Sequence, residues 1–599
     1  MSLAARHQAG LVSVRVGPRV LRAQQWSLML SFIVFPNDGV DAQHFPPRHA
    51  FLVGGDEVPT QGTVELGEGL VRAEKQVSTT VALAVQVEVP KPDLPEHLAR
   101  LMPGGQSPSM GLLTLHTTVL PDRPQPYMLM IELARRQIMQ FLNKMEDWQL
   151  SDLPADHPIM QQFELARARF TDALVMHRST REGETAKANT AAAQALALAL
   201  EAGEELALVQ SVRQLKLRQT GEGYKAAVAH ATKAKLEAPA NHAPVVVPGS
   251  GHATVAGLPA IGCAVSPAHN SEPLQKAALS CCDFVTMPMR WSDMEPVEGK
   301  YNWTPTDRWI EWAIRTAKLP VVGGPVVDFR PRSAPDWLFI WENDYETLRD
   351  LVFEHVQAVV TRYRKTVSRW TVVSGLHVNT NFKISFEQIL DLTRLCVMLV
   401  KKLHPTAKLQ IELQQPWGEY LVTNKRSIPP YMYAEAVLTT GLPIDAIALR
   451  MQMGHAEPGL STRDLLSLSN TLDRFAALEK PIFVNAVGVP SSPILPTPFV
   501  PRVGAEATDP YEPGSWRTPW SEATQANWMT QALSIICSKP YVQGVAWHEL
   551  YDVAPHASPE IPTGGLITQD GKPKMGLTRL AEIRRCLREG KTPLTLLKH

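Results

Sequence analysis

The sequence predicts an α/β protein: a (β/α)8 TIM barrel in the C-terminal half, preceded by an all-β sandwich domain and an α-helical segment. Three observations predict this class. The chain has 599 residues, several times the usual domain size of roughly 100–200 residues. Its first part contains short β-rich runs separated by turn residues. Its last part alternates such runs with helix-length amphipathic segments, which is the order of a parallel barrel.

Residues 1–125 are predicted to form the β-sandwich. Short alternating or β-branched runs, each bounded by Gly, Pro, Asp or Asn, are typical of that architecture. A domain of this kind either binds a ligand or only packs against its neighbours. The runs are Leu30–Phe35, Ala50–Val53, Gly62–Leu66, Val77–Val89 and Gly111–Val119.

Residues 126–237 are predicted to be helical, because apolar side chains recur at helical spacing from Tyr127 onward. The stretch Thr190–Val212 is rich in Ala, Leu and Glu, which are strong helix formers. Residues 238–257 contain Pro and Gly clusters and are predicted to be a linker.

The barrel is predicted to span residues 258–590. Eight β-rich runs, each followed by a helix-length segment, match the eight units of the fold. In such barrels the functional residues lie at the C-terminal ends of the strands and in the loops that follow them. The predicted strands are Ala260–Val265, Asp283–Thr286, Leu319–Gly324, Trp370–Ser374, Leu409–Leu413, Ala446–Gln452, Ile482–Val487 and Val542–Trp547.

The composition excludes several classes of protein. Lys+Arg and Asp+Glu both number 59, so no overall positive charge favours nucleic acid or a membrane surface. No apolar run reaches the ~18 residues of a membrane span. The six cysteines show no zinc-like spacing, and no nucleotide motif is present, so we expect no metal and no cofactor. The run Trp26–Phe35 lacks a signal-peptide cleavage site, which favours a cytoplasmic location.

Several motifs of the barrel half resemble glycoside hydrolase family 10, the xylanase family, over about residues 258–590. They occur in the family's order and on the expected strands. The segments that carry the resemblance are Ile261–Val265, Met289–Trp291, Glu295-Pro296, Gly299–Trp303, Pro335–Trp337, Arg362–Arg364, Trp370–Val373, Ile444–Ile447, Pro481–Val484 and Gly544–Trp547.

The resemblance implies a retaining glycosidase, which needs two carboxyl groups about 5–5.5 Å apart, one as acid/base and one as nucleophile. The family's Asn-Glu pair after the fourth strand corresponds here to Ser374 and Gly375. The family's nucleophile, a Glu that follows a Thr on the seventh strand, corresponds to Ala486 after Asn485. Both catalytic carboxylates are therefore expected to be absent. The first substitute pair to consider is Glu412 with Glu549, and Asp328 and Asp552 are further strand-end acids.

The resemblance also implies a glycan-binding mouth. Aromatic faces stack on sugar rings, and polar strand-end residues bind hydroxyl groups. We expect the partner to be a polysaccharide or oligosaccharide, with a β-1,4-linked glycan favoured, and the sandwich to be carbohydrate-binding-like. The predicted carbohydrate-binding residues are Arg290, Trp291, Trp337, Ser374, Gln452, Asn485 and Trp547.

Three functions stay open at this point. The first is a pseudo-glycosidase that binds a carbohydrate without cleaving it. The second is an active xylan-like hydrolase with the relocated pair Glu412 and Glu549. The third is a scaffold protein whose helical segment and proline-rich loop, Pro490–Pro519, bind a protein partner. The sequence does not define the oligomeric state.

Overall fold

The computed structural model describes residues 29–35, 48–67, 69–101, 107–181, 183–234, 243–247, 251–330, 333–455, 459–494, 514–552, 561 and 563–597. The start of the run Trp26–Phe35, up to residue 28, and most of the predicted proline-rich loop lie outside these residues. The chain divides into two compact units, Met1–Ala202 and Gly203–His599. The division falls within one long helix, α5 (Glu184–Thr220).

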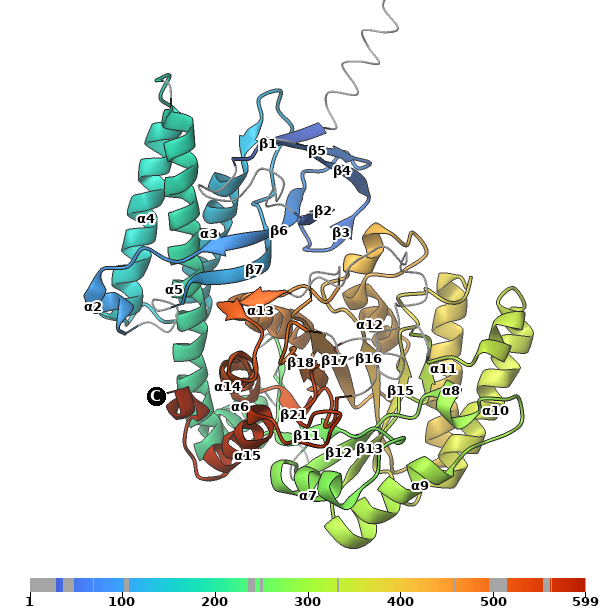
Figure 1. Ribbon diagram of the computed structural model, residues 1–599. Coiled ribbons are helices and arrows are strands. Elements are labelled where there is room, and N and C mark those ends of the chain that lie inside the picture. Colours follow the sequence, from blue (N-terminus) through green and yellow to red (C-terminus); the bar gives the residue numbers. More distant parts are fainter. Residues whose placement is uncertain are drawn as a thin grey trace, which may run out of the picture. The chain divides into compact units, whose positions relative to one another are not determined.

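The first unit contains two sheets and several helices (Figure 1). One sheet has the order β4-β5-β1-β8, and in the other β6 pairs with both β2 and β7 while β3 extends from β2. The strands are β1 (Met29–Ile33), β2 (Arg48–Val53), β3 (Pro59–Thr60), β4 (Gly62–Gly67), β5 (Leu70–Lys75), β6 (Ala82–Pro90), β7 (Ser109–His116) and β8 (Tyr127–Met128). The helices before α5 are α2 (Glu96–Ala99), α3 (Leu129–Asp147) and α4 (Pro158–His177).

The helices of this unit pack through apolar faces and one buried polar contact. The rings of Phe141 on α3 and Phe163 on α4 stack with centroids 3.9 Å apart. Beside Phe163, the Gln162 side chain donates to Glu201 at 3.0 Å and to the Leu198 carbonyl at 3.2 Å. A buried carboxylate needs such a donor, and here the donor fixes the register of α4 against α5.

The second unit contains a closed parallel barrel, which confirms the predicted fold class (Figure 1). The ring closes because β13 pairs with β15 as well as with β12. The barrel strands are β11 (Ala260–Ala264), β12 (Phe284–Met287), β13 (Val321–Gly323), β15 (Arg369–Ser374), β16 (Lys408–Leu413), β17 (Ala446–Gln452), β18 (Ile482–Gly488) and β21 (Val542–Trp547). Shorter strands are β9 (Val245–Val246) and β10 (Ala253–Thr254), within the predicted linker, β14 (Val327–Asp328), β19 (Ser515–Trp516) and β20 (Thr518–Pro519).

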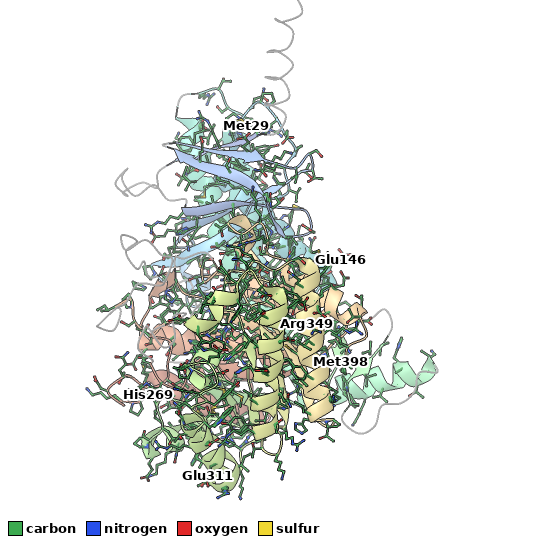
Figure 2. The ribbon with its side chains drawn as sticks, turned by 90° about the vertical axis from the view of Figure 1, so that its right-hand side faces the viewer. Met29, Glu146, His269, Glu311, Arg349 and Met398 are labelled. Atoms are coloured by element: carbon green, nitrogen blue, oxygen red, sulfur yellow. The ribbon has the colours of Figure 1, made fainter. Side chains whose placement is uncertain are left out.

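Helices follow the strands and cover the barrel. Arg349 on α10 and Met398 on α11 mark two of these helices, which run side by side (Figure 2). The Arg349 guanidinium joins them by donating to Asp391 at 2.8 Å. The helices are α6 (Glu222–Lys233), α7 (Glu272–Cys281), α8 (Trp291–Met294), α9 (Thr304–Glu311), η2 (Trp312–Ala317), η3 (Asp336–Trp341), α10 (Tyr345–Tyr363), α11 (Phe386–Leu403), η4 (Glu419–Val422), α12 (Pro430–Thr439), α13 (Leu465–Ala476), α14 (Glu522–Ser538), α15 (Met575–Arg588) and η5 (Pro593–Leu597).

An apolar layer fills the N-terminal half of the barrel interior. Phe284, Val322, Phe483 and Ala546 pack together there, with the two phenyl rings 5.4 Å apart. A Cβ on Gly262 would lie 2.5 Å from the Phe284 ring, so this position must be a glycine. Close packing of this layer makes the lower barrel a solid core.

The C-terminal part of α5 is joined to the base of the barrel by a buried arginine. The Arg218 guanidinium donates to the carbonyl oxygens of Gly257 at 2.7 Å, Cys537 at 3.0 Å, Lys539 and Val542. Burial lowers the pKa of this guanidinium to about 10, which still leaves it charged at neutral pH. The carbonyl groups at the end of α14 thereby receive hydrogen-bond donors. A buried helix end needs them, because its last carbonyl groups have no partner within the helix.

In the part of the chain that the structure describes, no helix combines the length and the apolar character needed to cross a bilayer.

Replacing Arg218 with Met should lower the free energy of unfolding by about 3 kcal/mol, because several buried carbonyl groups lose their donors. The control is Lys216→Met, an exposed position on the same helix, where the change should stay within about 0.5 kcal/mol. Thermal denaturation measures both. Equal midpoints for the two variants would show that Arg218 does not join the helix to the barrel.

Candidate functional site

The interior of the barrel changes from apolar to polar toward the C-terminal ends of its strands. Side chains on a strand alternate between its two faces, so the next inward residue is two positions further on. Two positions beyond Phe284, Phe483 and Ala546 the inward residues are Thr286, Asn485 and His548. The polar layer therefore lies directly above the apolar core, at the end of the barrel where sites are built in this fold.

Glu412 is the centre of the polar layer. Its side chain is fully buried on β16. One carboxylate oxygen accepts from Ser374 Oγ at 2.7 Å and lies 3.5 Å from Arg450 Nη1. The other accepts from Asn485 Nδ2. The donors come from β15, β17 and β18, so one carboxylate connects four neighbouring strands, its own included.

Gly375 follows β15, at the position that the family resemblance assigns to the acid/base. It has a left-handed backbone, with φ of 72°. A Cβ at this position would lie 3.0 Å from Arg330 Cγ, 3.1 Å from Arg330 N and 3.3 Å from Gln414 Oε1. Arg330 therefore lies against the position, and an added side chain would have to displace it.

Asp328 holds Arg330 in that place. The Arg330 Nε atom donates to Asp328 at 2.8 and 2.9 Å, Nη2 donates at 2.5 Å, and the Arg330 backbone N–H donates at 3.0 Å. Asn381 also donates to the Arg330 carbonyl at 3.2 Å. Asp328, a candidate acid in the sequence, is thus the partner of this arginine. A bidentate pair of this kind is geometrically well defined.

Ala486 lies on β18 and is buried, next to Asn485 in sequence. Its strand partner is Arg450 on β17. At both positions that the resemblance assigns to the catalytic carboxylates, the side chain of the preceding residue, Ser374 or Asn485, is hydrogen-bonded to Glu412.

The predicted aromatic residues differ in their accessibility. Trp291 is 1% exposed, donates to Glu295 at 2.7 Å and stacks on His355. Trp547 is equally buried and donates to the Gly564 carbonyl at 2.9 Å. Trp337 is only partly buried, packs edge-on against Trp291 and donates to the Glu295 carbonyl. Of these three tryptophans, only Trp337 presents a partly exposed ring.

Arg290 and Gln452 complete the predicted set. The Arg290 side chain is 21% exposed, and its Nη1 lies 4.0 Å from Asp293. Gln452 contacts His548 Nδ1 through its amide. His377, in the loop after β15, stacks on Tyr433 with ring centroids 5.2 Å apart, and burial lowers its pKa to about 4. His377 is therefore neutral at physiological pH.

The substitute pair is not joined by a direct contact. Among the described residues, the contacts of the Glu412 carboxylate are with Ser374, Arg450 and Asn485. Glu549 follows β21 and is buried. Burial raises the pKa of the Cys263 thiol on β11, and the charge of Glu549 adds to this effect, so Glu549 lies near β11.

Three buried oxygen atoms of the mouth have no hydrogen-bond partner within the described part of the chain. They are Thr286 Oγ1, Gln414 Oε1 and Asn485 Oδ1, from three different strand ends. Unpartnered buried polar atoms are costly, so a ligand or water that donates hydrogen bonds would stabilise them. Sequence reasoning missed Thr286 and Gln414, although their inward register relative to Phe284 and Glu412 could have revealed them.

No cluster of three or more His, Cys, Asp or Glu side chains suited to a metal ion occurs in the regions that the structure describes. The fold and the polar strand ends define the protein as a TIM-barrel protein with a polar mouth. The model of glycosyl hydrolase family 10 matches residues 252–552. The chain belongs to this family.

The chain is also similar to curated xylanases and to solved xylanase structures. Endo-1,4-beta-xylanase B of Thermotoga neapolitana is 24% identical over 205 residues, covering 33% of this chain and 55% of that enzyme. Endo-1,4-beta-xylanase C of Paenibacillus barcinonensis is 26% identical over 213 residues, covering 32% of this chain and 18% of that enzyme. The chain thus spans only about half of the first relative and a smaller share of the second. The structure of xylanase 10B from Thermotoga maritima aligns with 55% of this chain and 96% of its own, at 19% identity and a TM-score of 0.41.

Replacing Gly375 with Ala should destabilise the barrel by about 3 kcal/mol, because the new methyl group meets Arg330 in a strained backbone conformation. The matched control is Gly441→Ala. Gly441 has φ of 73°, and a Cβ added there would meet no atom within 4 Å, so only the backbone cost of about 1 kcal/mol applies. Chemical denaturation measures the difference, and equal losses would mean that Arg330 does not close the position.

Proposed function

We propose that the barrel binds a β-1,4-linked glycan at its mouth and does not carry out the family's retaining hydrolysis. The observation that carries this proposal is the pair Gly375 and Ala486, which stand where the resemblance places the acid/base and the nucleophile. Neither side chain can transfer a proton or form a glycosyl ester.

The surroundings of these positions support the proposal. Arg330 covers Gly375, and the residues that precede the two positions are bonded to Glu412. A double displacement needs two accessible carboxyl groups facing one sugar. The described mouth offers buried carboxylates that are already engaged, such as Asp328 and Glu412.

The polar layer supports binding. Thr286, Gln414 and Asn485 offer buried oxygen atoms that sugar hydroxyl groups would satisfy. Trp337 and Arg290 are partly exposed and belong to the sequence motifs that carry the resemblance, and an aromatic face suits a pyranose ring. The names of the curated relatives favour a xylan-like β-1,4 glycan as the ligand.

The main alternative is an active hydrolase that uses Glu412 and Glu549. In that case Glu412 would have to exchange its contacts with Ser374, Asn485 and Arg450 for a sugar. Breaking a buried, hydrogen-bonded charge network of this kind costs several kcal/mol. A scaffold role for the helical segment and the proline-rich loop is the second alternative.

Binding is tested by titrating the purified chain with xylo-oligosaccharides and mixed-linkage gluco-oligosaccharides in a calorimeter. Trp337→Ala should weaken the affinity about tenfold, because it removes a partly exposed ring from the mouth. The control is Trp148→Ala, a partly buried tryptophan of the first unit, which should leave the affinity unchanged. If neither oligosaccharide binds the unaltered chain, glycan binding is wrong; a stable protein complex instead would favour the scaffold.

Hydrolysis is tested separately with xylan and aryl β-glycosides. We expect no product, because the acid/base and nucleophile positions carry no carboxyl group. Glu412→Gln and Glu549→Gln serve as the diagnostic variants. Product that forms with the unaltered chain and disappears in both variants would establish the relocated pair and overturn the proposal.

A further inference from the structure

A buried lysine lies at the rim of the barrel, outside the polar layer. Lys574 is 3% exposed and immediately precedes α15. Its ammonium group has three donors, and three acceptors surround it: Asp552 Oδ2 at 2.5 Å, Ser491 Oγ at 2.8 Å and the Thr563 carbonyl at 3.2 Å. The hydrogen-bonding capacity of the ammonium is therefore filled.

These partners come from separate segments of the chain. Ser491 lies in the loop after β18, Asp552 in the loop after β21, and Thr563 in the segment that leads to α15. Both loops follow C-terminal strand ends, so they border the mouth of the barrel. Lys574 thus connects the beginnings of two neighbouring rim loops.

Further contacts tie the same segments to each other and to the strand below. The Ser491 backbone N–H donates to the Thr563 carbonyl at 3.0 Å, and the Gly565 N–H donates to Asp552 at 2.8 Å. The Gly564 carbonyl accepts from Trp547 Nε1 at 2.9 Å. The segment 563–565 is therefore held between Lys574 on one side and the end of β21 on the other.

Stability alone does not explain a buried ion pair at this place. Taking an ammonium and a carboxylate out of water costs several kcal/mol, and well-packed apolar residues of similar size are often as stable. The pair instead fixes geometry, because each hydrogen bond of the ammonium group holds one chain segment in place.

The ion pair is charged under the conditions of the test below. Burial raises the pKa of Asp552 to about 6, so at pH 7.5 the carboxylate is charged. Besides Asp552, Glu522 also acts electrostatically on Lys574.

We propose that Lys574, through Asp552, Ser491 and Thr563, is a positioning residue that sets the spacing of the two rim loops and thereby shapes the glycan site. This proposal rests on the proposed function, because the ligand is the β-1,4-linked glycan. The role of Lys574 itself follows from its hydrogen bonds at the rim. Within the described residues, the ammonium group of Lys574 contacts Asp552, Ser491 and Thr563, so it acts on the polar layer only through these partners.

The test uses the full-length double variant Lys574→Met/Asp552→Asn at pH 7.5. It removes both charges, keeps the side-chain volumes and leaves an oxygen to accept from the Gly565 N–H. The matched control is Lys539→Met/Asp473→Asn, in which the Lys539 ammonium and the Asp473 carboxylate are 2.7 Å apart. Lys539 lies just before β21, at the opposite end of that strand, and Asp473 lies on α13.

Two measurements are made on each variant: amide hydrogen exchange and affinity for xylo-oligosaccharides. We expect the rim variant to exchange about tenfold faster at Ser491, Asp552 and Gly565, and to bind about tenfold more weakly. The control should show neither effect, even if both variants lose similar thermal stability. Unchanged exchange in a folded rim variant, or the same loss of affinity in the control, would overturn the proposal.

The hydrogen-exchange measurement separates this proposal from the proposed function. If the unaltered chain binds no glycan, the proposed function fails, yet faster exchange confined to the rim variant still shows that Lys574 holds the loops. If the double variant does not fold, Ser491→Ala removes a single partner of the ammonium. Its expected result is faster exchange at Gly565, and unchanged exchange there would overturn the proposal.

Discussion

The upper half of the barrel depends on the contacts that surround the buried carboxylate of Glu412. A carboxylate removed from water must be matched by donors, and Ser374, Asn485 and Arg450 supply them from three other strands. Each of these side chains is thereby fixed in the interior. The polar layer consequently has a defined arrangement, and oxygen atoms such as Asn485 Oδ1 are left without a hydrogen-bond partner among the described residues.

The two ends of the barrel meet different physical demands. At the base, Phe284 and Phe483 fill the interior, and Arg218 satisfies backbone carbonyls that would otherwise be buried without donors. At the mouth, buried oxygen atoms such as Thr286 Oγ1 and Asn485 Oδ1 have no partner within the described residues. The packed core and the strand ends are thus separate, and this separation is how one fold hosts many functions.

The barrel was predictable because its signal is local: alternation along a strand and the spacing between strands are written in consecutive residues. The site was only partly predictable. Ser374 and Asn485 were identified from the family resemblance, but that both would share Glu412 as a partner depends on contacts between distant parts of the sequence. Likewise, the sequence cannot tell that Trp291 is buried while Trp337 is partly exposed, because exposure depends on packing between distant segments.

The contact between Arg330 and Gly375 constrains the order in which this chain can change. A larger side chain at position 375 meets both the Arg330 stem and its backbone, and Asp328 holds that arginine in place. A substitution at 375 therefore has to displace the 328–330 turn, which costs stability. A carboxylate gained at this strand end would carry that cost until the turn had changed as well. Descendants of this chain that gain a new chemistry should consequently acquire it elsewhere on the rim.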